Sequence, residues 1–417
     1  MNKFKKIMLE HNIPLYICVD PSMKNTFVSY NLKYGSSGLW FKFNNNGINY
    51  EVGSGYAHYL EHLLGEHSPF GNMYQNFEKR LQDANAYTAD SVTSYHFKGR
   101  DNIEKSLEEL IISMEQPVFE QKDVDATRHA IEEAASYCDD SGVMIVDFVE
   151  NNLYDGFSKY DYTLSPIGNR ETTKAMTIED LYNCYNAFYT DDRKFIVVIG
   201  NVNEERIVEC INNALTKGPK HESHLVLPTI DFRGIKTSDG VIERSIEEPI
   251  AALGIKVKKP DFITMKEFDY IMNVLRYYSY SSRAANELNR NGTIDSYEYC
   301  YLTNVEDYLN YIVSFTAKDK EKCAQKLLEL FNKKDLSRED YELMKKAIIA
   351  KQVRYMEDKY RYIKDFPTNI FCSESYSDID FYQSISYEQF LNTLRGLDFS
   401  QYTVGEVKKL AKKGPSL

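Results

Sequence analysis

Two histidines four residues apart, with a glutamate between them, place the strongest constraint on how this chain folds. The segment reads His58-Tyr59-Leu60-Glu61-His62. On an α-helix, residues three and four apart lie on one face, so both imidazoles and the carboxylate can point to the same side. Apolar residues at helical spacing around this segment predict a helix over about 55–66 that begins at a glycine-rich turn.

This arrangement has the chemistry of a zinc site. Two imidazoles are common zinc ligands, and a neighbouring carboxylate can take a proton from the attacking water. Since the chain has eight histidines, a chance pair at this spacing has a probability of roughly 0.15, and a glutamate at the third offset lowers it to about 0.01. We therefore expect His58 and His62 to bind Zn²⁺ and Glu61 to act as general base. The alternative is two solvent-facing histidines on an amphipathic helix.

Length and periodicity predict an α+β fold with two domains. A chain of 417 residues is too long for one compact core. Strand-like runs at 14–19, 27–34, 86–97 and 194–200 alternate with helical stretches at 73–81, 102–115, 122–138 and 177–189. The second half repeats this order loosely, with strands at 249–257, 297–302 and 309–316. We expect a metal-site domain over 1–218, a linker over 219–236 and a second domain over 237–417.

Composition indicates which classes of partner the protein does not bind and in which compartment it lies. The net charge is −12 and basic residues are scattered, which argues against nucleic-acid binding. No apolar run approaches the roughly 18 residues that a membrane span needs, and the N-terminal segment lacks the apolar region of an export signal. The seven cysteines form no CxxC pair and their number is odd. We expect a cytoplasmic protein with reduced thiols.

The surroundings of the histidine pair carry a family resemblance. The motif is the inverted H-x-x-E-H arrangement, and the matching segments extend through the first half in order. They include 33–36, 55–63, 84–88, 117–119, 166–171, 177–182 and 197–202, with looser matches at 281–282 and 292–296. In these segments the chain resembles the pitrilysin/insulinase family of zinc metallopeptidases, in its half-length bacterial branch.

The resemblance implies a fold, an activity and a partner. Each of two related domains would be an antiparallel β-sheet covered by helices on one side, as in pitrilysin and mitochondrial processing peptidase. His58 and His62 would bind zinc, and Glu61 would be the general base. Half-length members usually pair two chains to enclose a chamber, so a second pitrilysin-like subunit, identical or related, is expected.

The third zinc ligand departs from the family pattern. In relatives it is a glutamate on a later helix, and counting from Asn85 places it at Ala134. Glu133 is one residue away, or about 100° around a helix. A local register shift would bring Glu133 to the metal; otherwise Ala134 is a natural or engineered loss. The alternative for Glu133 is an exposed helix face.

Four further residues are expected to contact substrate. Asn85 and Ala86 match the segment that offers its edge to an extended peptide in relatives. Relatives also place an arginine and, seven residues later, a tyrosine against the substrate carbonyl and the developing oxyanion. Arg290 and Tyr297 have that spacing, although alignment on Gly292 puts other residues there. A partner chain could supply the pair instead.

The sequence thus predicts a zinc endopeptidase subunit that cleaves peptides in a chamber formed with a second chain. Its expected role is peptide maturation or leader removal. Its alternative is a catalytically impaired subunit of the same architecture that holds a substrate or partner. A third possibility is a peptide-binding module of a modified-peptide pathway.

Overall fold

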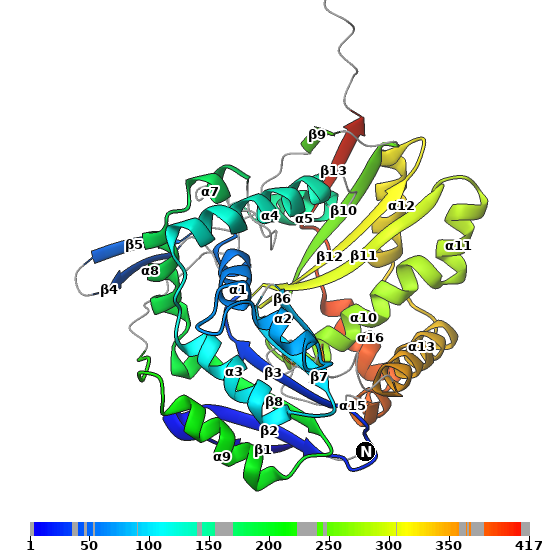
Figure 1. Cartoon of the computed structure of the whole chain (residues 1–417). Helices are drawn as coiled ribbons and strands as arrows, with labels where there is room; N and C mark the ends of the chain where they lie inside the picture. Colours follow the sequence, from blue (N-terminus) through cyan, green and yellow to red (C-terminus); the bar gives the residue numbers. More distant parts are fainter. Residues whose placement is uncertain are drawn as a thin grey trace, which may run out of the picture. The chain divides into compact units, whose positions relative to one another are not determined.

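The computed structural model describes residues 4–35, 41–45, 48–52, 55–89, 91–139, 144–154, 170–222, 240–244, 248–305, 307–357, 364, 367 and 379–409. The chain forms two compact units (Figure 1). Unit 1 comprises Met1–Ala135, Leu164–Thr229 and Lys359–Glu374, and unit 2 comprises Ser136–Thr163, Ile230–Asp358 and Ser375–Leu417. Each unit therefore takes a segment from the other half of the sequence.

Unit 1 is built on a six-stranded sheet in the order β1-β2-β8-β3-β7-β6. Its strands are β1 (Lys5–Met8), β2 (Pro14–Val19), β3 (Thr26–Leu32), β6 (Asp83–Thr88), β7 (Thr93–Gly99) and β8 (Lys194–Gly200). β2 and β8 run parallel, and the other neighbours are antiparallel. A separate hairpin joins β4 (Phe41–Asn45) and β5 (Ile48–Val52).

Helices cover one face of this sheet. They are α1 (Tyr56–Glu66), α2 (Met73–Glu78), α3 (Ile103–Glu115), α4 (Gln121–Asp139), α7 (Arg170–Ala175), α8 (Ile178–Phe188) and α9 (Glu204–Leu215), with short 3₁₀ turns at Glu10–Asn12 and Asp191–Arg193. Alternate strand residues such as Val28, Tyr30 and Ile196 join buried side chains of α1, α2, α3, α8 and α9 in one core. Period-two alternation thus sends every second residue of each strand toward the helices.

Unit 2 repeats this plan with a five-stranded sheet in the order β11-β12-β10-β13-β9. Its strands are β9 (Gly240–Arg244), β10 (Ile250–Lys258), β11 (Ser296–Val305), β12 (Tyr308–Thr316) and β13 (Tyr402–Lys409). Its helices are α5 (Met144–Asn152), α10 (Met265–Ser281), α11 (Arg283–Arg290), α12 (Lys320–Asn332), α13 (Arg338–Glu357), α15 (Ile379–Ser384) and α16 (Tyr387–Gly396). Among the described strands of this unit, only β13 and β9 pair in parallel.

The two faces of the unit 2 sheet are covered by different parts of the chain. Residues such as Leu253 and Val313 pack against helices of the second half. Ala252, Ile312 and Val407 point the other way and pack against α5, which comes from the first half. Glycines allow this close approach: a Cβ on Gly254 would lie 2.4 Å from Val149 Cγ1.

Local sequence explains where several helices begin. Capping boxes start α8, α10 and α16, with Thr177, Thr264 and Ser386 as the N-cap residues. In each, the hydroxyl accepts a hydrogen bond from the third residue of the helix, whose side chain accepts one from the N-cap backbone.

The predicted architecture is confirmed, with one correction in the elements. The chain is α+β, and each unit has a largely antiparallel sheet covered by helices; in unit 2, α5 also packs against the second face of the sheet. The single strand expected over 86–97 is wrong, because β6 and β7 form a hairpin there, and Ala89 N donates to Val92 O at 2.8 Å. Most of the predicted linker 219–236 lies outside the described residues, so the division at that point stays a prediction.

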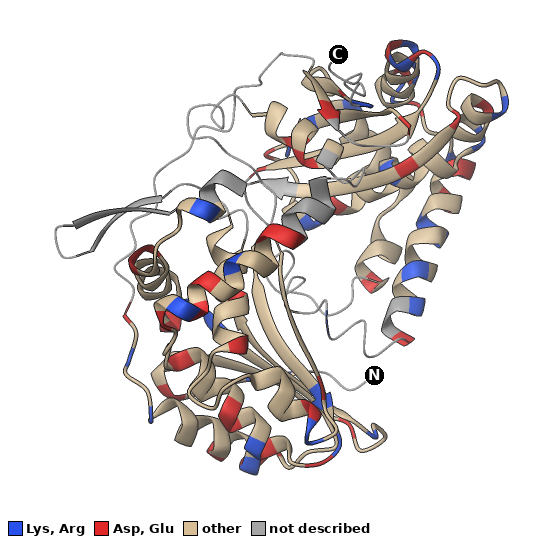
Figure 2. Ribbon diagram, turned by 45° about the horizontal axis from the view of Figure 1, so that its top comes forward, with Lys and Arg blue, Asp and Glu red and all other residues tan. Residues whose placement is uncertain are grey.

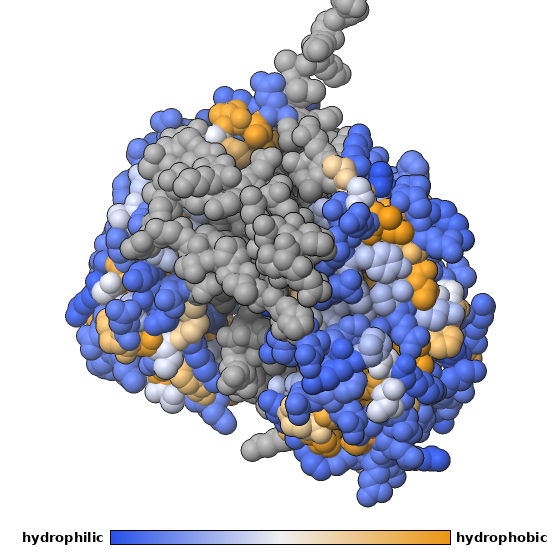
Figure 3. All heavy atoms as spheres, turned by 90° about the vertical axis from the view of Figure 1, so that its left-hand side faces the viewer, coloured by the Kyte–Doolittle hydropathy of each residue, from blue (hydrophilic) through white to orange (hydrophobic). Residues whose placement is uncertain are grey.

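The surface is polar and mixed in charge. Basic and acidic residues lie side by side along the helices (Figure 2). The face drawn in Figure 3 shows apolar patches scattered among hydrophilic atoms. In the described part of the chain, no helix combines the length and the apolar character needed to cross a membrane.

Candidate metal centre

The histidine pair lies on α1, as expected. The helix begins after Gly55, whose φ of 90° is a left-handed conformation that glycine adopts without strain. Tyr59, Leu60 and Leu63 are fully buried against the sheet and the neighbouring helices. Core packing therefore fixes which face of α1 carries the polar side chains.

His58 and His62 face one another across one helical turn. Their ring centroids are 4.9 Å apart and the ring planes are nearly perpendicular, at 85°. His58 is half-buried, and among the described residues its buried Nδ1 atom has no hydrogen-bond partner. Burial, together with the charge of His62, lowers the pKa of His58 to about 4. His58 is therefore neutral at neutral pH, which is the form that binds a metal.

Glu61 is buried beside the pair, with 7% of its surface exposed. Thr88, near the end of β6, donates a hydrogen bond from Oγ1 to Glu61 Oε2 at 2.6 Å. Burial raises the pKa of Glu61, and the Thr88 hydrogen bond and the charge of His62 oppose that shift. One carboxylate oxygen is thus fixed by the sheet.

Sequence reasoning missed a second carboxylate, Glu66. Its Oε1 lies 3.0 Å from His62 Nδ1, four residues earlier on the same helix. Burial lowers the pKa of His62, but this hydrogen bond and the charges of Glu61 and Glu66 outweigh burial and leave the pKa raised. The i, i+4 spacing on a helix was the signal that could have found it.

The residues of α1 fit a zinc ion. Two imidazoles lie on one face, one of them with a buried nitrogen that has no partner in the described residues, and a buried carboxylate lies next to them. Imidazole nitrogen and carboxylate oxygen are the donors that catalytic zinc sites use. His58 and His62 would hold the ion, and Glu61 would lie beside it.

The third predicted ligand is not grouped with the other two. Glu133 lies on α4 and is exposed. Among the described residues, no three His, Cys, Asp or Glu side chains lie close enough to share a metal ion. Ala134 belongs to the same helix, and its side chain lies outside the description. Glu133 as a ligand stays a prediction.

Asn85 and Ala86 lie on β6, which pairs only with β7 among the described strands and ends the sheet. The Asn85 side chain accepts a hydrogen bond from Ala86 N at 2.9 Å. An edge strand has unpaired backbone groups that can pair with an extended peptide. The structure thus places both residues where an added strand would lie.

Arg290 and Tyr297 lie in unit 2. Arg290 is the exposed last residue of α11. Tyr297 lies on β11, and its hydroxyl donates to Ser279 O at 3.3 Å. In the described part of the chain no hydrogen bond joins the two side chains, so their role at a substrate carbonyl stays a prediction.

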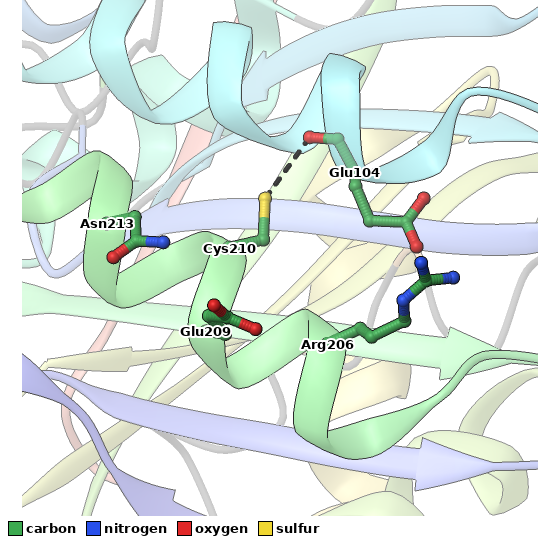
Figure 4. A pocket seen from close by; sticks show the side chains of 5 residues that line it. All are labelled: Glu104, Arg206, Glu209, Cys210 and Asn213. Carbon is green, nitrogen blue, oxygen red and sulfur yellow. Dashed lines mark hydrogen bonds between the residues drawn. The ribbon is translucent and has the colours of Figure 1, made fainter.

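A groove elsewhere in unit 1 contains none of these residues. It lies between α3 and α9, has a volume of about 340 Å³, and is lined by Glu104, Arg206, Glu209, Cys210 and Asn213 (Figure 4). Cys210 Sγ donates to Glu104 O at 3.2 Å. Burial, followed by the charges of Glu108 and Glu104, raises the pKa of Cys210 to about 11, which makes the thiol a poor nucleophile.

Two family models match the chain in sequence. The insulinase (peptidase family M16) model matches residues 45–165, which include α1 and α4, and the peptidase M16 inactive-domain model matches residues 175–348. The chain belongs to the M16 (insulinase) peptidase family. The expected family is thereby confirmed.

Relatives of this M16 protein agree in sequence and fold. The uncharacterized zinc protease YmfH of Bacillus subtilis (strain 168) is 27% identical over 69% of this chain and 68% of its own. The mitochondrial-processing peptidase subunit beta of Dictyostelium discoideum is 26% identical over 47% of this chain, and that match spans only 44% of the relative. A crystal structure described as an M16-like peptidase from Alicyclobacillus acidocaldarius has a TM-score of 0.84 at 17% identity, covering 98% of this chain and 99% of its own.

Proposed function

We propose that this chain is the zinc-binding subunit of an endopeptidase. The observation that carries the proposal is the pair His58 and His62 on one face of α1, with the buried Glu61 beside them. Membership of a peptidase family, and relatives named as zinc proteases, support it.

Zinc bound to His58 and His62, with Glu133 as third ligand, would polarise a peptide carbonyl and activate water. Glu61 would accept the proton of the attacking water. Its burial favours proton uptake, and the Thr88 hydrogen bond holds one oxygen so that the other is free to act.

The substrate would be a peptide in extended form. Its backbone would pair with β6, the edge strand of the described sheet, at Asn85 and Ala86, so recognition would depend partly on main-chain hydrogen bonds. Arg290 and Tyr297, or their counterparts in a partner, would contact the carbonyl. We further propose that a second M16-like subunit completes the chamber and that the protein is cytoplasmic. Its role would be peptide maturation or leader removal. The relative named as a subunit of a processing peptidase supports the second subunit and this role.

Metal analysis and one substitution test the proposal. The purified chain, alone and mixed with a related subunit of similar length, should bind one zinc ion. Glu61→Gln should keep the zinc and lower cleavage of a fluorogenic peptide by roughly 10²- to 10⁴-fold, because a general base is removed while the ligands remain. Glu78→Gln on the exposed surface of α2 is the matched control. Full activity in Glu61→Gln would remove Glu61 from the mechanism.

A catalytically impaired subunit is the second candidate. The exposed position of Glu133, and Ala134 where the family pattern has glutamate, favour it. In that case the chain would hold substrate or partner while another chain cleaves. The same metal analysis separates the two: zinc binding that Glu133→Ala abolishes supports the enzyme, and no zinc binding supports the impaired subunit.

A further inference from the structure

The last residue of α1 contacts the candidate metal centre. We propose that Glu66 is a positioning residue that holds His62 with its Nε2 atom free to bind the metal. The contact is the 3.0 Å approach of Glu66 Oε1 to His62 Nδ1. This inference rests on the proposed function, because it concerns how the same centre is prepared for zinc.

The chemistry of imidazole gives the direction of the effect. A neutral ring carries one N–H, and an ionised carboxylate can only accept a hydrogen bond. The hydrogen must therefore lie on His62 Nδ1, which leaves the lone pair of Nε2 for a metal. His58 lacks this support among the described residues, since its buried Nδ1 has no partner. Of the two histidines, His62 is thus the one whose tautomer the protein selects.

Geometry argues that Glu66 acts through His62 rather than as a ligand. Eight residues separate His58 from Glu66, which is about 12 Å of helix. Zinc lies only about 2 Å from each ligand atom, so one ion cannot bind both His58 and Glu66 on a straight helix. The Glu66 carboxylate is also engaged on the Nδ1 side of the His62 ring.

Helix stability does not explain this glutamate. Glu66 is in the last turn of α1, where the negative end of the helix dipole disfavours an acidic side chain. A purely structural role would predict that replacing Glu66 destabilises the protein. The positioning role predicts unchanged or slightly higher stability together with weaker metal binding.

Three measurements on Glu66→Ala and Glu66→Gln test this. In the metal-free protein, long-range ¹H–¹⁵N spectra should show His62 as the Nδ1–H tautomer in the wild type and as a mixture in Glu66→Ala. Zinc affinity, from competition with a chelator, should fall roughly 10- to 100-fold in Glu66→Ala. It should fall less in Glu66→Gln, whose amide oxygen can still accept the hydrogen bond. Thermal midpoints, measured at a pH where His62 is neutral, should not decrease, and Glu78→Gln is the control for all three.

The outcomes separate this inference from the proposed function. A wild type that binds zinc, with Glu66→Ala unchanged in tautomer and affinity, overturns only the role of Glu66. A large drop in thermal midpoint with unchanged zinc affinity would make Glu66 structural and also overturn it. If the wild type binds no zinc, the proposed function fails and this inference fails with it.

Discussion

His58 and His62 have the same side chain but opposite electrostatics. Burial lowers the pKa of His58 to about 4, whereas hydrogen bonding to Glu66 and nearby carboxylates raise the pKa of His62 despite burial. The largest cause that raises the pKa of His62 is the hydrogen bond to Glu66, a contact that His58 lacks among the described residues. Two candidate ligands that look equivalent in the motif therefore have different electrostatic environments.

This inequality predicts two separate titrations in the metal-free protein. The C2–H resonance of His58 should titrate with a midpoint near pH 4, and that of His62 with a midpoint above the usual histidine value. Because folding lowers the pKa of His58, this residue contributes to the free energy of unfolding at a pH above its pKa in the unfolded chain. That contribution is lost as the pH falls through its pKa in the folded protein. Because folding raises the pKa of His62, this residue contributes to the free energy of unfolding at a pH below its pKa in the unfolded chain. That contribution is lost as the pH rises through its pKa in the folded protein.

Nuclear magnetic resonance with His58→Asn and His62→Asn variants assigns the two signals. Glu66→Gln should lower the His62 midpoint and leave His58 nearly unchanged. Coincident titration of both histidines near their usual value would contradict this assignment.

The residues of the site differ in how far the sequence could predict them. The placement of His58, Glu61 and His62 on one helix follows from a fixed spacing. The Thr88 contact could not be derived, because Thr88 lies 27 residues after Glu61, beyond all of α2, and no periodicity links the two. The third ligand is undecided because a shift of one residue on α4 rotates a side chain by about 100°.

At the scale of elements, a buried ion network ties β8 to the end of α3. Lys194 Nζ is fully buried and lies 2.7 Å from Glu115 Oε2 and 2.9 Å from Asp191 Oδ1. Tyr30 donates its hydroxyl to the other Glu115 oxygen at 2.7 Å. Two carboxylates thus share one ammonium in the core.

Lys194→Met should destabilise the protein by about 3–5 kcal/mol, because both carboxylates would stay buried without their cation. Urea unfolding measures the loss. The matched control is Lys217→Met, which breaks the exposed pair Lys217–Glu108 and should cost at most about 1 kcal/mol. Equal and small effects would show that Lys194 is not needed to neutralise the core.

Element types were predictable from the sequence where periodicity was strong, as in α8, β8, β10 and β12. The strand over 86–97 was misassigned because only the short segment Ala89-Asp90-Ser91 interrupts the β-favouring residues on either side of it. The location of α5 had no local signal at all. Its apolar residues predict burial without saying which sheet they cover, so only the structure shows that α5 joins unit 2.

At the scale of the whole molecule, the second half of the sequence needs α5, which belongs to the first half, to cover one face of its sheet. A fragment of residues 237–417 would lack α5 and expose Ala252, Ile312 and Val407. We expect it to aggregate, and to be rescued by co-expression with residues 1–236 or by a fused segment 144–154. Gel filtration and circular dichroism of the fragments check this. A soluble, cooperatively folded fragment without α5 would contradict it.

The glycines that contact α5 require the first and second halves of the sequence to be compatible with each other. A Cβ on Gly240, Gly254 or Gly405 would lie between 2.0 and 2.6 Å from a side-chain atom of Phe148 or Val149. Recombination near the linker would combine the first half of this chain, which carries α5, with the second half of a relative. If that second half has a residue larger than glycine at any of the three positions, α5 has no room to pack on its sheet. The three glycines of the second half therefore limit which first halves can be combined with it.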